Sequence, residues 1–138
     1  WGYAARVGHP PRVFLANMGP VAQHKARADF SIGFFEVGGF EVISNNGFAT
    51  AEQAADSALD SGAQAVVICS TDDTYPQLVP PIVEQLKAAI PEVVVILAGY
   101  PQDQIEAHEA AGIDAFIHIR ANCYEMNLWL QQQIGIRE

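Results

Sequence analysis

The sequence predicts a doubly wound α/β fold, in which a five-stranded parallel sheet is covered by helices on both faces. Short apolar runs alternate along the 138 residues with segments of helical length, which is typical of repeated β-α-β units. The two central runs, at 64–69 and 93–98, are almost continuously aliphatic and indicate strands that are buried on both faces. At this length we expect one domain with the flavodoxin-like strand order 2-1-3-4-5.

Five apolar runs supply the expected strands. They lie at 12–17 (RVFLAN), 40–44 (FEVIS), 63–70 (AQAVVICS), 92–99 (EVVVILAG) and 114–119 (DAFIHI). Residues 1–11 precede the first run, and Gly8, Pro10 and Pro11 indicate that they are the remnant of a linker. The domain itself is therefore expected to occupy residues 12–138.

The helices between these runs are marked by residues suited to helix ends. Pro76 and Pro101 fit the first turn of a helix. Gly62 and Gly112 follow helical segments at positions suited to a left-handed C-terminal cap. Three residue pairs fit a capping box, in which a side chain at each helix start bonds a backbone N–H: Thr50 with Gln53, Thr74 with Gln77, and Asn122 with Glu125.

The composition argues against two classes of partner. Seven basic residues against sixteen acidic ones give a net charge of −9, which disfavours binding to a nucleic-acid backbone. No apolar run reaches the roughly 20 residues of a membrane-spanning helix. Cys69 and Cys123 lack the spacing of metal ligands, so we expect reduced thiols in a cytoplasmic protein.

The loops that follow the strands hold the candidate sites, because ligands of such sheets bind beyond the carboxyl ends of the strands. Asp72 and Asp73 follow the third strand, where a receiver domain has its phosphorylated aspartate. A receiver also needs acidic residues after the first strand and a lysine after the fifth, where this chain has Asn17, Met18 and Arg120. A solvated acidic loop is therefore favoured over a receiver-like signalling site.

His24 lies about one turn into the first expected helix, on a helical stripe with Val21, Ala28 and Phe35. A histidine on such a stripe is more often a packed residue than a ligand. The preceding loop has a single glycine, Gly19, and matches neither a dinucleotide-binding nor a phosphate-binding pattern. With no nucleophile placed beside a base and no paired carboxylates, we predict no catalytic residue.

The chain from Arg12 to about Ile134 nevertheless resembles the cobalamin-binding domain of acyl-CoA mutases, most closely that of methylmalonyl-CoA mutases. The segments that carry the resemblance are VFLANMGP with AQHKARADF, FFEVGGFEVISNNGF, TAEQAADSALDSGAQAVVICSTDDTY, LVPPIVEQLKAA and VILAGYP. The resemblance implies a part in the adenosylcobalamin-dependent isomerisation of (R)-methylmalonyl-CoA and succinyl-CoA.

The first cofactor motif of this family is Asp-x-His-x-x-Gly. Its histidine is the lower axial ligand of cobalt, its aspartate hydrogen-bonds the other ring nitrogen, and its glycine leaves room for the cofactor. His24 stands in the place of the histidine, but Ala22 replaces the aspartate and Arg27 replaces the glycine. The resemblance thus implies that His24 is the candidate cobalt ligand, without its usual neighbours.

Two further motifs of the family are also altered. The Ser-x-Leu after the third strand falls on 69–71, and the Gly-Gly after the fourth falls on Ala98 and Gly99. The candidate cofactor-binding residues implied by the resemblance are therefore His24, Ser70 and Gly99. Departures from the family pattern are concentrated at the cofactor site, while the strand cores are kept.

This pattern resembles the small subunit of heterodimeric methylmalonyl-CoA mutases, in which the large subunit binds cobalamin and substrate. Our first hypothesis is a non-catalytic domain whose partner is that large catalytic subunit, and the alternative is a functional cobalamin-binding domain with His24 on cobalt. Under the first, we expect little or no cobalamin binding, and little effect of His24→Ala on stability. The apolar groups expected to contribute to the partner surface are Tyr100, Tyr124, Trp129 and Leu130.

Overall fold

The computed structural model describes residues 12–19, 21–36, 40–43, 47–61, 63, 65–71, 74–89, 93–99 and 103–117. Its elements, in chain order, are β1 (Arg12–Asn17), α2 (Val21–Glu36), β2 (Glu41–Ile43), α3 (Ala51–Ser61), β3 (Ala65–Cys69), α4 (Tyr75–Ala89), β4 (Val94–Ala98), α5 (Ile105–Ala111) and β5 (Ala115–Ile117). The predicted features that lie outside the described residues are the linker at 1–11, Gly62, Asp72, Asp73, Tyr100, Pro101, Arg120, the helix start at Asn122 with Glu125, and Cys123, Tyr124, Trp129 and Leu130.

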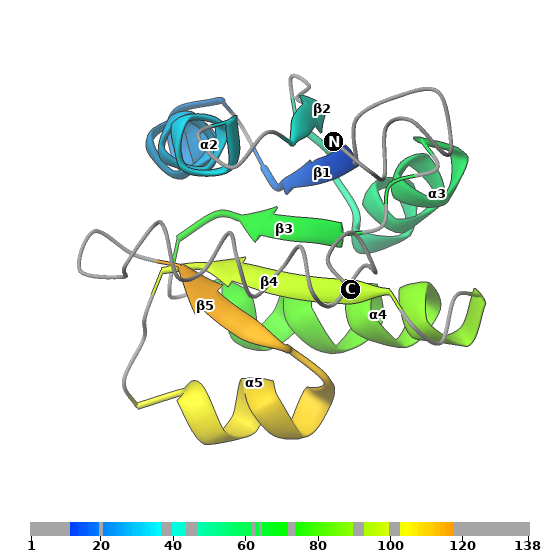
Figure 1. Cartoon of the computed structure of the whole chain (residues 1–138). Helices are drawn as coiled ribbons and strands as arrows, with labels where there is room; N and C mark the ends of the chain where they lie inside the picture. The colour runs from blue at the N-terminus through cyan, green and yellow to red at the C-terminus, as the bar shows by residue number, and fades with distance from the viewer. Residues whose placement is uncertain are drawn as a thin grey trace, which may run out of the picture.

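The strands form one parallel sheet in the order β2-β1-β3-β4-β5 (Figure 1). Val13 pairs with Ala65 across β1 and β3, and Ile68 pairs with Leu97 across β3 and β4. The predicted strand order and parallel arrangement are therefore confirmed. The strands are shorter than predicted at several ends, and β2 keeps only three residues.

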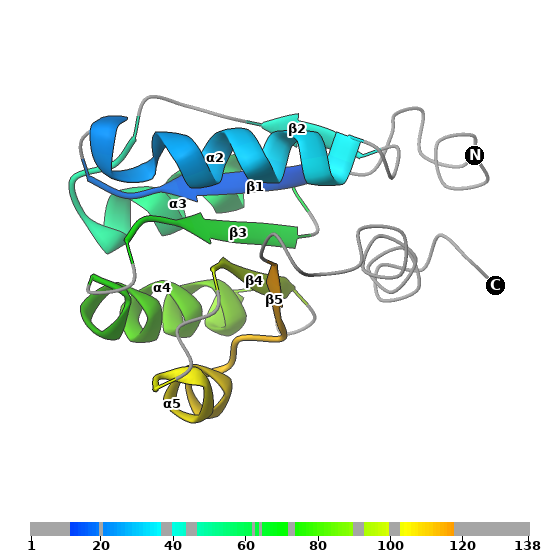
Figure 2. The ribbon, with the colours of Figure 1, turned by 90° about the vertical axis from the view of Figure 1, so that its left-hand side faces the viewer.

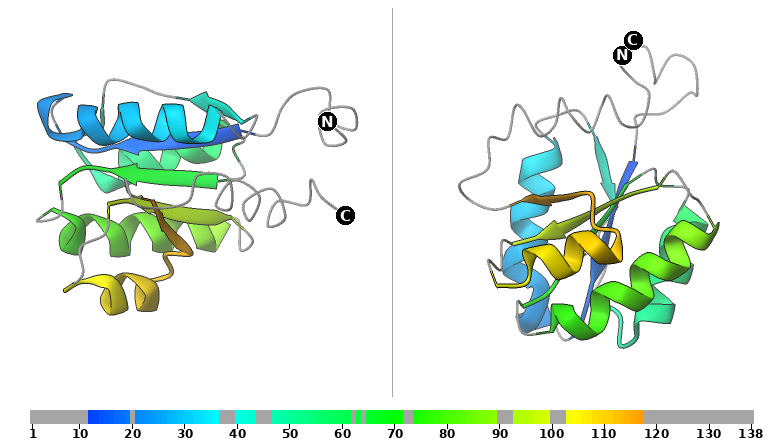
Figure 3. Two further views of the ribbon diagram at one scale, coloured as in Figure 1. Left: turned by 60° about the vertical axis from the view of Figure 1, so that its left-hand side comes forward. Right: turned by 90° about the horizontal axis from the view of Figure 1, so that it is seen from below.

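Helices cover both faces of the sheet. Successive strand residues point to opposite sides, so each strand contributes apolar side chains to both layers of the core. Val13, Leu15 and Val67 pack on the side of α2, whereas Phe14 and Val66 pack on the side of α3 and α4. The view from below shows α2 on one side of the sheet and α3 and α4 on the other (Figure 3). β3 and β4 are buried along their whole length, as their continuous apolar sequence predicted.

Three of the four predicted helix-end signals in the described residues act as expected, and one of them is Pro76, the second residue of α4. The N–H of Gln53 donates to Thr50 Oγ1 at 3.2 Å, at the start of α3. Gly112 ends α5 in the left-handed conformation, with φ of 118°, and its N–H bonds the carbonyls of His108 and Glu109. The capping box predicted at Thr74 is not formed, because the Thr74 hydroxyl turns back to lie 2.7 Å from the carbonyl oxygen of Thr71.

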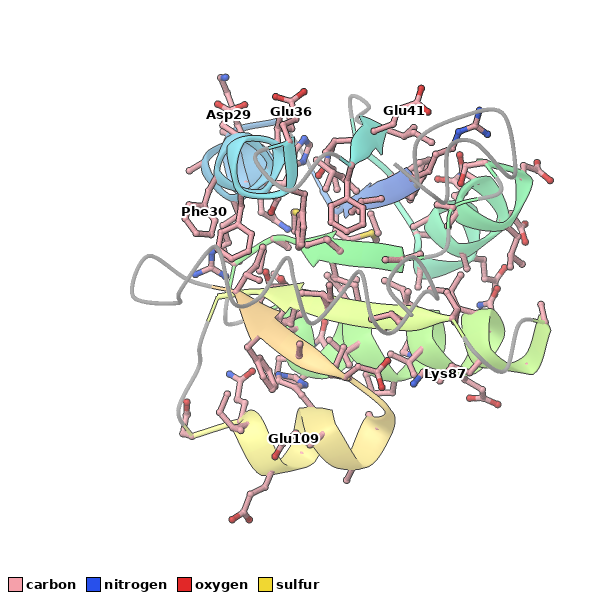
Figure 4. The ribbon with its side chains drawn as sticks, in the orientation of Figure 1. Asp29, Phe30, Glu36, Glu41, Lys87 and Glu109 are labelled. Atoms are coloured by element: carbon pink, nitrogen blue, oxygen red, sulfur yellow. The ribbon has the colours of Figure 1, made fainter. Side chains whose placement is uncertain are left out.

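Acidic side chains project from the outer surface of the helices. Asp29 and Glu36 on α2 and Glu109 on α5 are exposed and point away from the sheet (Figure 4). In the described part of the chain, no helix combines the length and the apolar character that crossing a bilayer requires.

Candidate functional site

The candidate site is the edge of the sheet where the strands end. β1 and β3 are neighbours, and their arrowheads point to the same edge (Figure 2). The chain runs outward from these two strands in opposite directions, towards β2 and towards β4, so the reversal of strand order lies between them. Ligands of open α/β sheets bind in the crevice outside this point. We refer to it below as the carboxyl edge.

Gln23, in the first turns of α2, bridges the ends of β1 and β3. Its Nε2 donates to Ser70 Oγ at 2.7 Å and lies 3.3 Å from the carbonyl oxygen of Met18. This arrangement requires a glycine at position 19, because a Cβ there would lie 2.5 Å from the same Nε2. Gly19 also has a φ of 79°, which disfavours other residues. The crevice between these two strand ends is therefore occupied by a side chain of the domain itself.

Arg27, one turn further along α2, bridges the ends of β3 and β4. Its Nη1 donates to the carbonyl oxygens of Ser70 at 2.8 Å and Ala98 at 3.2 Å. The guanidinium carbon also lies 5.5 Å from the centre of the Tyr75 ring, in the geometry of a cation–π contact. The positive charge thus meets carbonyl oxygens at the ends of two strands.

Tyr75, the first residue of α4, is buried at the same place. Its hydroxyl donates to the carbonyl oxygen of Ala98 and accepts from the N–H of Ser70 at 3.0 Å. Burial raises the pKa of the Tyr75 phenol, and the nearby charge of Arg27 only partly opposes the rise. The phenol therefore remains protonated and can keep donating its hydrogen bond.

Ser70 and Gly99 lie at the ends of β3 and β4. Ser70 is fully buried, and its hydroxyl accepts from Gln23 and lies 2.9 Å from the Thr74 hydroxyl. Gly99 has a φ of 128°, and its N–H donates to the carbonyl oxygen of Ile117 on β5 at 2.6 Å. Of the three predicted site residues, the network around Arg27 includes Ser70, and it reaches Ala98, the residue before Gly99.

His24 lies in a separate contact, against the loop between β2 and α3. Its side chain is 3% exposed, and a Cβ built on Gly47 would lie 2.6 Å from its ring carbon Cε1. Within the described residues, Nδ1 of His24 has no hydrogen-bond partner. The predicted packing of His24 with Ala28 and Phe35 on one helical stripe agrees with their common burial. Because the ring is buried, His24→Ala would leave a cavity, and we expect it to lower stability by more than the small effect expected from the sequence.

Cys69 is a buried thiol beneath α2. Its Sγ lies 3.7 Å from Ser31 Oγ, which donates in turn to the carbonyl oxygen of Arg27 at 2.8 Å. Burial raises the pKa of Cys69 to about 12, so the thiol is protonated and unreactive. In the part of the chain that the structure describes, no group of three His, Cys, Asp or Glu residues could hold a metal ion.

Gln23 and Tyr75 are the residues of this edge that the sequence did not single out. Gln23, Arg27 and Ser31 are spaced four residues apart, which places them on one face of α2. That spacing is the signal that could have identified a polar stripe facing the sheet. The position of Tyr75 at the start of α4 carried no comparable signal.

Comparison with curated proteins identifies homologues of this chain. Over 130 residues, 94% of its length, the chain is 37% identical to the methylmalonyl-CoA mutase small subunit of Porphyromonas gingivalis. The chain is homologous to the methylmalonyl-CoA mutase small subunits. It is also 37% identical over 109 residues, 78% of its length, to the small subunit of Streptomyces virginiae. The matched segment spans 20% and 18% of these two subunits, about a fifth of their length.

No family model matches this small-subunit homologue. Among solved structures, it superposes on a cobalamin-binding protein from Desulfitobacterium hafniense with a TM-score of 0.71 and 19% identity, covering 91% of this chain and 60% of that one. It also superposes on the receiver domain of a sensor histidine kinase from Pseudomonas aeruginosa with a TM-score of 0.64 and 18% identity, covering 91% and 98%. At these identities the superpositions establish the fold alone.

Proposed function

We propose that this domain is a non-catalytic part of a methylmalonyl-CoA mutase small subunit. It supports the adenosylcobalamin-dependent isomerisation of (R)-methylmalonyl-CoA and succinyl-CoA, which the large subunit carries out with its own cofactor. The homology to proteins named small subunits supports this proposal, because that name implies a larger partner. The free, buried thiol of Cys69 is in keeping with a cytoplasmic assembly.

The observation that carries the proposal is the filled carboxyl edge. Gln23 spans the ends of β1 and β3, and Arg27 spans the ends of β3 and β4. In the cobalamin-binding pattern, the position of Arg27 is a glycine that leaves room for the cofactor. Here a long charged side chain with hydrogen bonds to two strand ends takes that room.

The surroundings of His24 also do not fit a cobalt ligand. A metal-bound histidine usually donates its second ring nitrogen to a carboxylate or carbonyl, which fixes the tautomer and raises the basicity of the ligand. Ala22, at the position of the family's aspartate, offers no such group and is exposed. Nδ1 of His24 instead lies beside Gly47, with no hydrogen-bond partner in the described residues.

The alternative function is cobalamin binding through His24. We retain it because a cobalamin-binding protein has the same fold. It requires His24 to leave its contact with Gly47 and Arg27 to release the strand ends. Absorbance spectra of cobalamin, recorded with native protein and with His24→Ala, separate the two functions. We expect the same spectrum in both mixtures. A base-off spectrum that the native protein produces and His24→Ala does not would favour the alternative.

The partner is tested with the full-length protein. We expect it to co-purify with a large mutase subunit, and we expect mutase activity to require the large subunit. A large subunit that is stable and fully active without the small one would contradict the supporting role. Mutase activity of the small subunit alone, with added adenosylcobalamin, would contradict the non-catalytic assignment.

A further inference from the structure

We propose that Arg27 is an internal ligand of the carboxyl edge: its guanidinium fills a site between the ends of β3 and β4, and a free alkylguanidinium can take that site when the side chain is removed. The inference rests on the proposed function in one respect, namely that no cofactor occupies this edge. It adds a binding site of defined chemistry, suited to a planar cation whose N–H groups face oxygen acceptors.

The contacts of Arg27 define the site. Nη1 faces the carbonyl oxygens of Ser70 and Ala98 and the hydroxyl of Tyr75, at 2.8, 3.2 and 3.2 Å. The Tyr75 hydroxyl has one proton, which it gives to Ala98, so towards Arg27 it acts as an acceptor. All three groups thus present oxygen lone pairs to one nitrogen, an arrangement that selects a donor-only cation.

The aromatic ring adds shape selectivity to this site. The guanidinium carbon lies 5.5 Å from the centre of the Tyr75 ring, and a planar cation gains both stacking and electrostatic attraction from such a ring. The ring itself is fixed, because it is buried and meets His108 edge-on at a centroid distance of 6.2 Å. A lysine ammonium would keep the charge but lose the planar group that lies over the ring.

The site also joins the two layers of helices. Arg27 belongs to α2, on one face of the sheet, and Tyr75 begins α4, on the other face. Their contact passes around the ends of β3 and β4 rather than through the sheet. Without the guanidinium, Ser70 and Ala98 each lose a hydrogen bond at their carbonyl oxygens, and α2 loses its tie to β4 at this edge.

The test is chemical rescue of Arg27→Ala in the full chain, with ethylguanidinium as the probe. We expect the equilibrium constant for unfolding to rise at least ten-fold in this variant. If ethylguanidinium binds with a Kd of about 1 mM, then about 10 mM of it should lower that constant roughly ten-fold. The same addition should give no stabilisation of the native protein, in which the site is filled.

Three variants control the experiment. Lys25→Ala removes an exposed cation from the same helix, and neither destabilisation nor rescue is expected. Arg27→Met fills the space without donors, and should be destabilised without being rescued. Arg27→Lys should unfold more readily than the native protein, and also without rescue, because its side chain occupies the site.

The outcomes decide the proposal in either direction. The proposal would be overturned if Arg27→Ala were as stable as Lys25→Ala. It would also be overturned if ethylguanidinium stabilised Arg27→Ala no more than it stabilises Lys25→Ala. If Arg27→Ala does not fold alone, the probe should restore its folded fraction, and failure to do so counts against the site. Rescue is measured without cobalamin or partner, so failed association with a large subunit would leave this result intact.

Discussion

At the scale of single residues, Tyr75 has a central place at the carboxyl edge, because both its hydroxyl and its ring contact other residues there. Its hydroxyl bonds Ser70 N–H and the Ala98 carbonyl, and its ring lies beneath Arg27 and against His108. Removing one polar atom from such a site leaves its buried partners unsatisfied, which costs more than the lost bond itself. The edge is therefore sensitive to changes of a single atom.

We predict that Tyr75→Phe lowers the free energy of unfolding by about 1–3 kcal/mol. The ring volume is kept, so the loss comes from the unpaired Ser70 N–H and from the lost donor to Ala98. Urea unfolding of native and variant protein measures the change. A variant within about 0.5 kcal/mol of the native protein, the scatter of surface substitutions, would mean that water replaces the hydroxyl.

Cys69 gives a prediction for alkaline pH. Burial raises its pKa from 9.0 to about 12, so the folded state holds the thiol proton more tightly than the unfolded state. This contribution to stability is fully present below pH 9 and is lost as the pH rises towards 12. Between these values, the unfolding free energy of native protein should fall faster than that of Cys69→Ala, by up to about 1.4 kcal/mol per pH unit. Urea unfolding from pH 8 to 10.5 tests this, and parallel curves for the two proteins would contradict it.

At the scale of elements, the first turns of α2 fit two glycine-containing loops. Gly19 accepts the side chain of Gln23, and Gly47 accepts the ring of His24. The loops are also joined by backbone hydrogen bonds, from Phe48 N–H to Asn17 and from Gly19 N–H to Phe48. The first turns of α2 therefore pack closely against the loop before the helix and the loop between β2 and α3, and a Cβ on either glycine would lie too close to them.

We predict opposite effects of alanine at two glycines. Gly47→Ala places a Cβ 2.6 Å from the His24 ring and 2.7 Å from the Gly19 carbonyl oxygen, at a φ of 110°. It should destabilise by more than about 1 kcal/mol. Gly33→Ala lies in the interior of α2 with nothing within 4 Å, and should stabilise by about 0.5–1 kcal/mol. Thermal unfolding of both variants checks the pair, and destabilisation by Gly33→Ala would refute this account of α2.

The strands and their order could be predicted because their signal is local. β3 and β4 are continuous aliphatic runs, and parallel connections of this length allow few topologies. The capping box at Thr50 followed from adjacent residues in the same way. At Thr74 the same pattern misled, because the hydroxyl faces the residues just before it, the carbonyl oxygen of Thr71 and the hydroxyl of Ser70.

The filled edge could be predicted only in part. The family pattern indicated that Arg27 replaces a glycine, and that the motif around His24 is incomplete. It did not indicate what Arg27 contacts, because its two backbone acceptors are 43 and 71 residues away along the chain. Those partners are backbone carbonyls, which every residue carries, so no residue type marks them in the sequence.

At the scale of the whole molecule, negative charge dominates the surface. The net charge is −9, and three of the described basic side chains, Arg12, Lys25 and Lys87, are each paired with a carboxylate. Such exposed pairs contribute little to stability. The remaining acidic groups repel one another, and Glu52, Asp56 and Asp60 are exposed at four-residue spacing along α3.

We predict that Asp56→Asn stabilises the domain, because it removes both like-charge contacts in the middle of that row. The expected gain is about 0.5 kcal/mol at low ionic strength. It should shrink in 0.5 M NaCl, since salt screens exposed charges. Thermal unfolding at the two salt concentrations measures the difference. A gain that is independent of salt would point to helix propensity in place of repulsion.

Because Cys69 is buried beneath α2, the rate at which its thiol is labelled reports how often that helix opens. The thiol lies between β3 and α2, and the chain has two cysteines, so a Cys123→Ser variant would leave Cys69 as its single thiol. A thiol-specific reagent can reach Sγ only when α2 lifts from the sheet or the whole domain unfolds. Labelling that is faster than global unfolding would then measure local opening of α2, separate from unfolding of the whole domain.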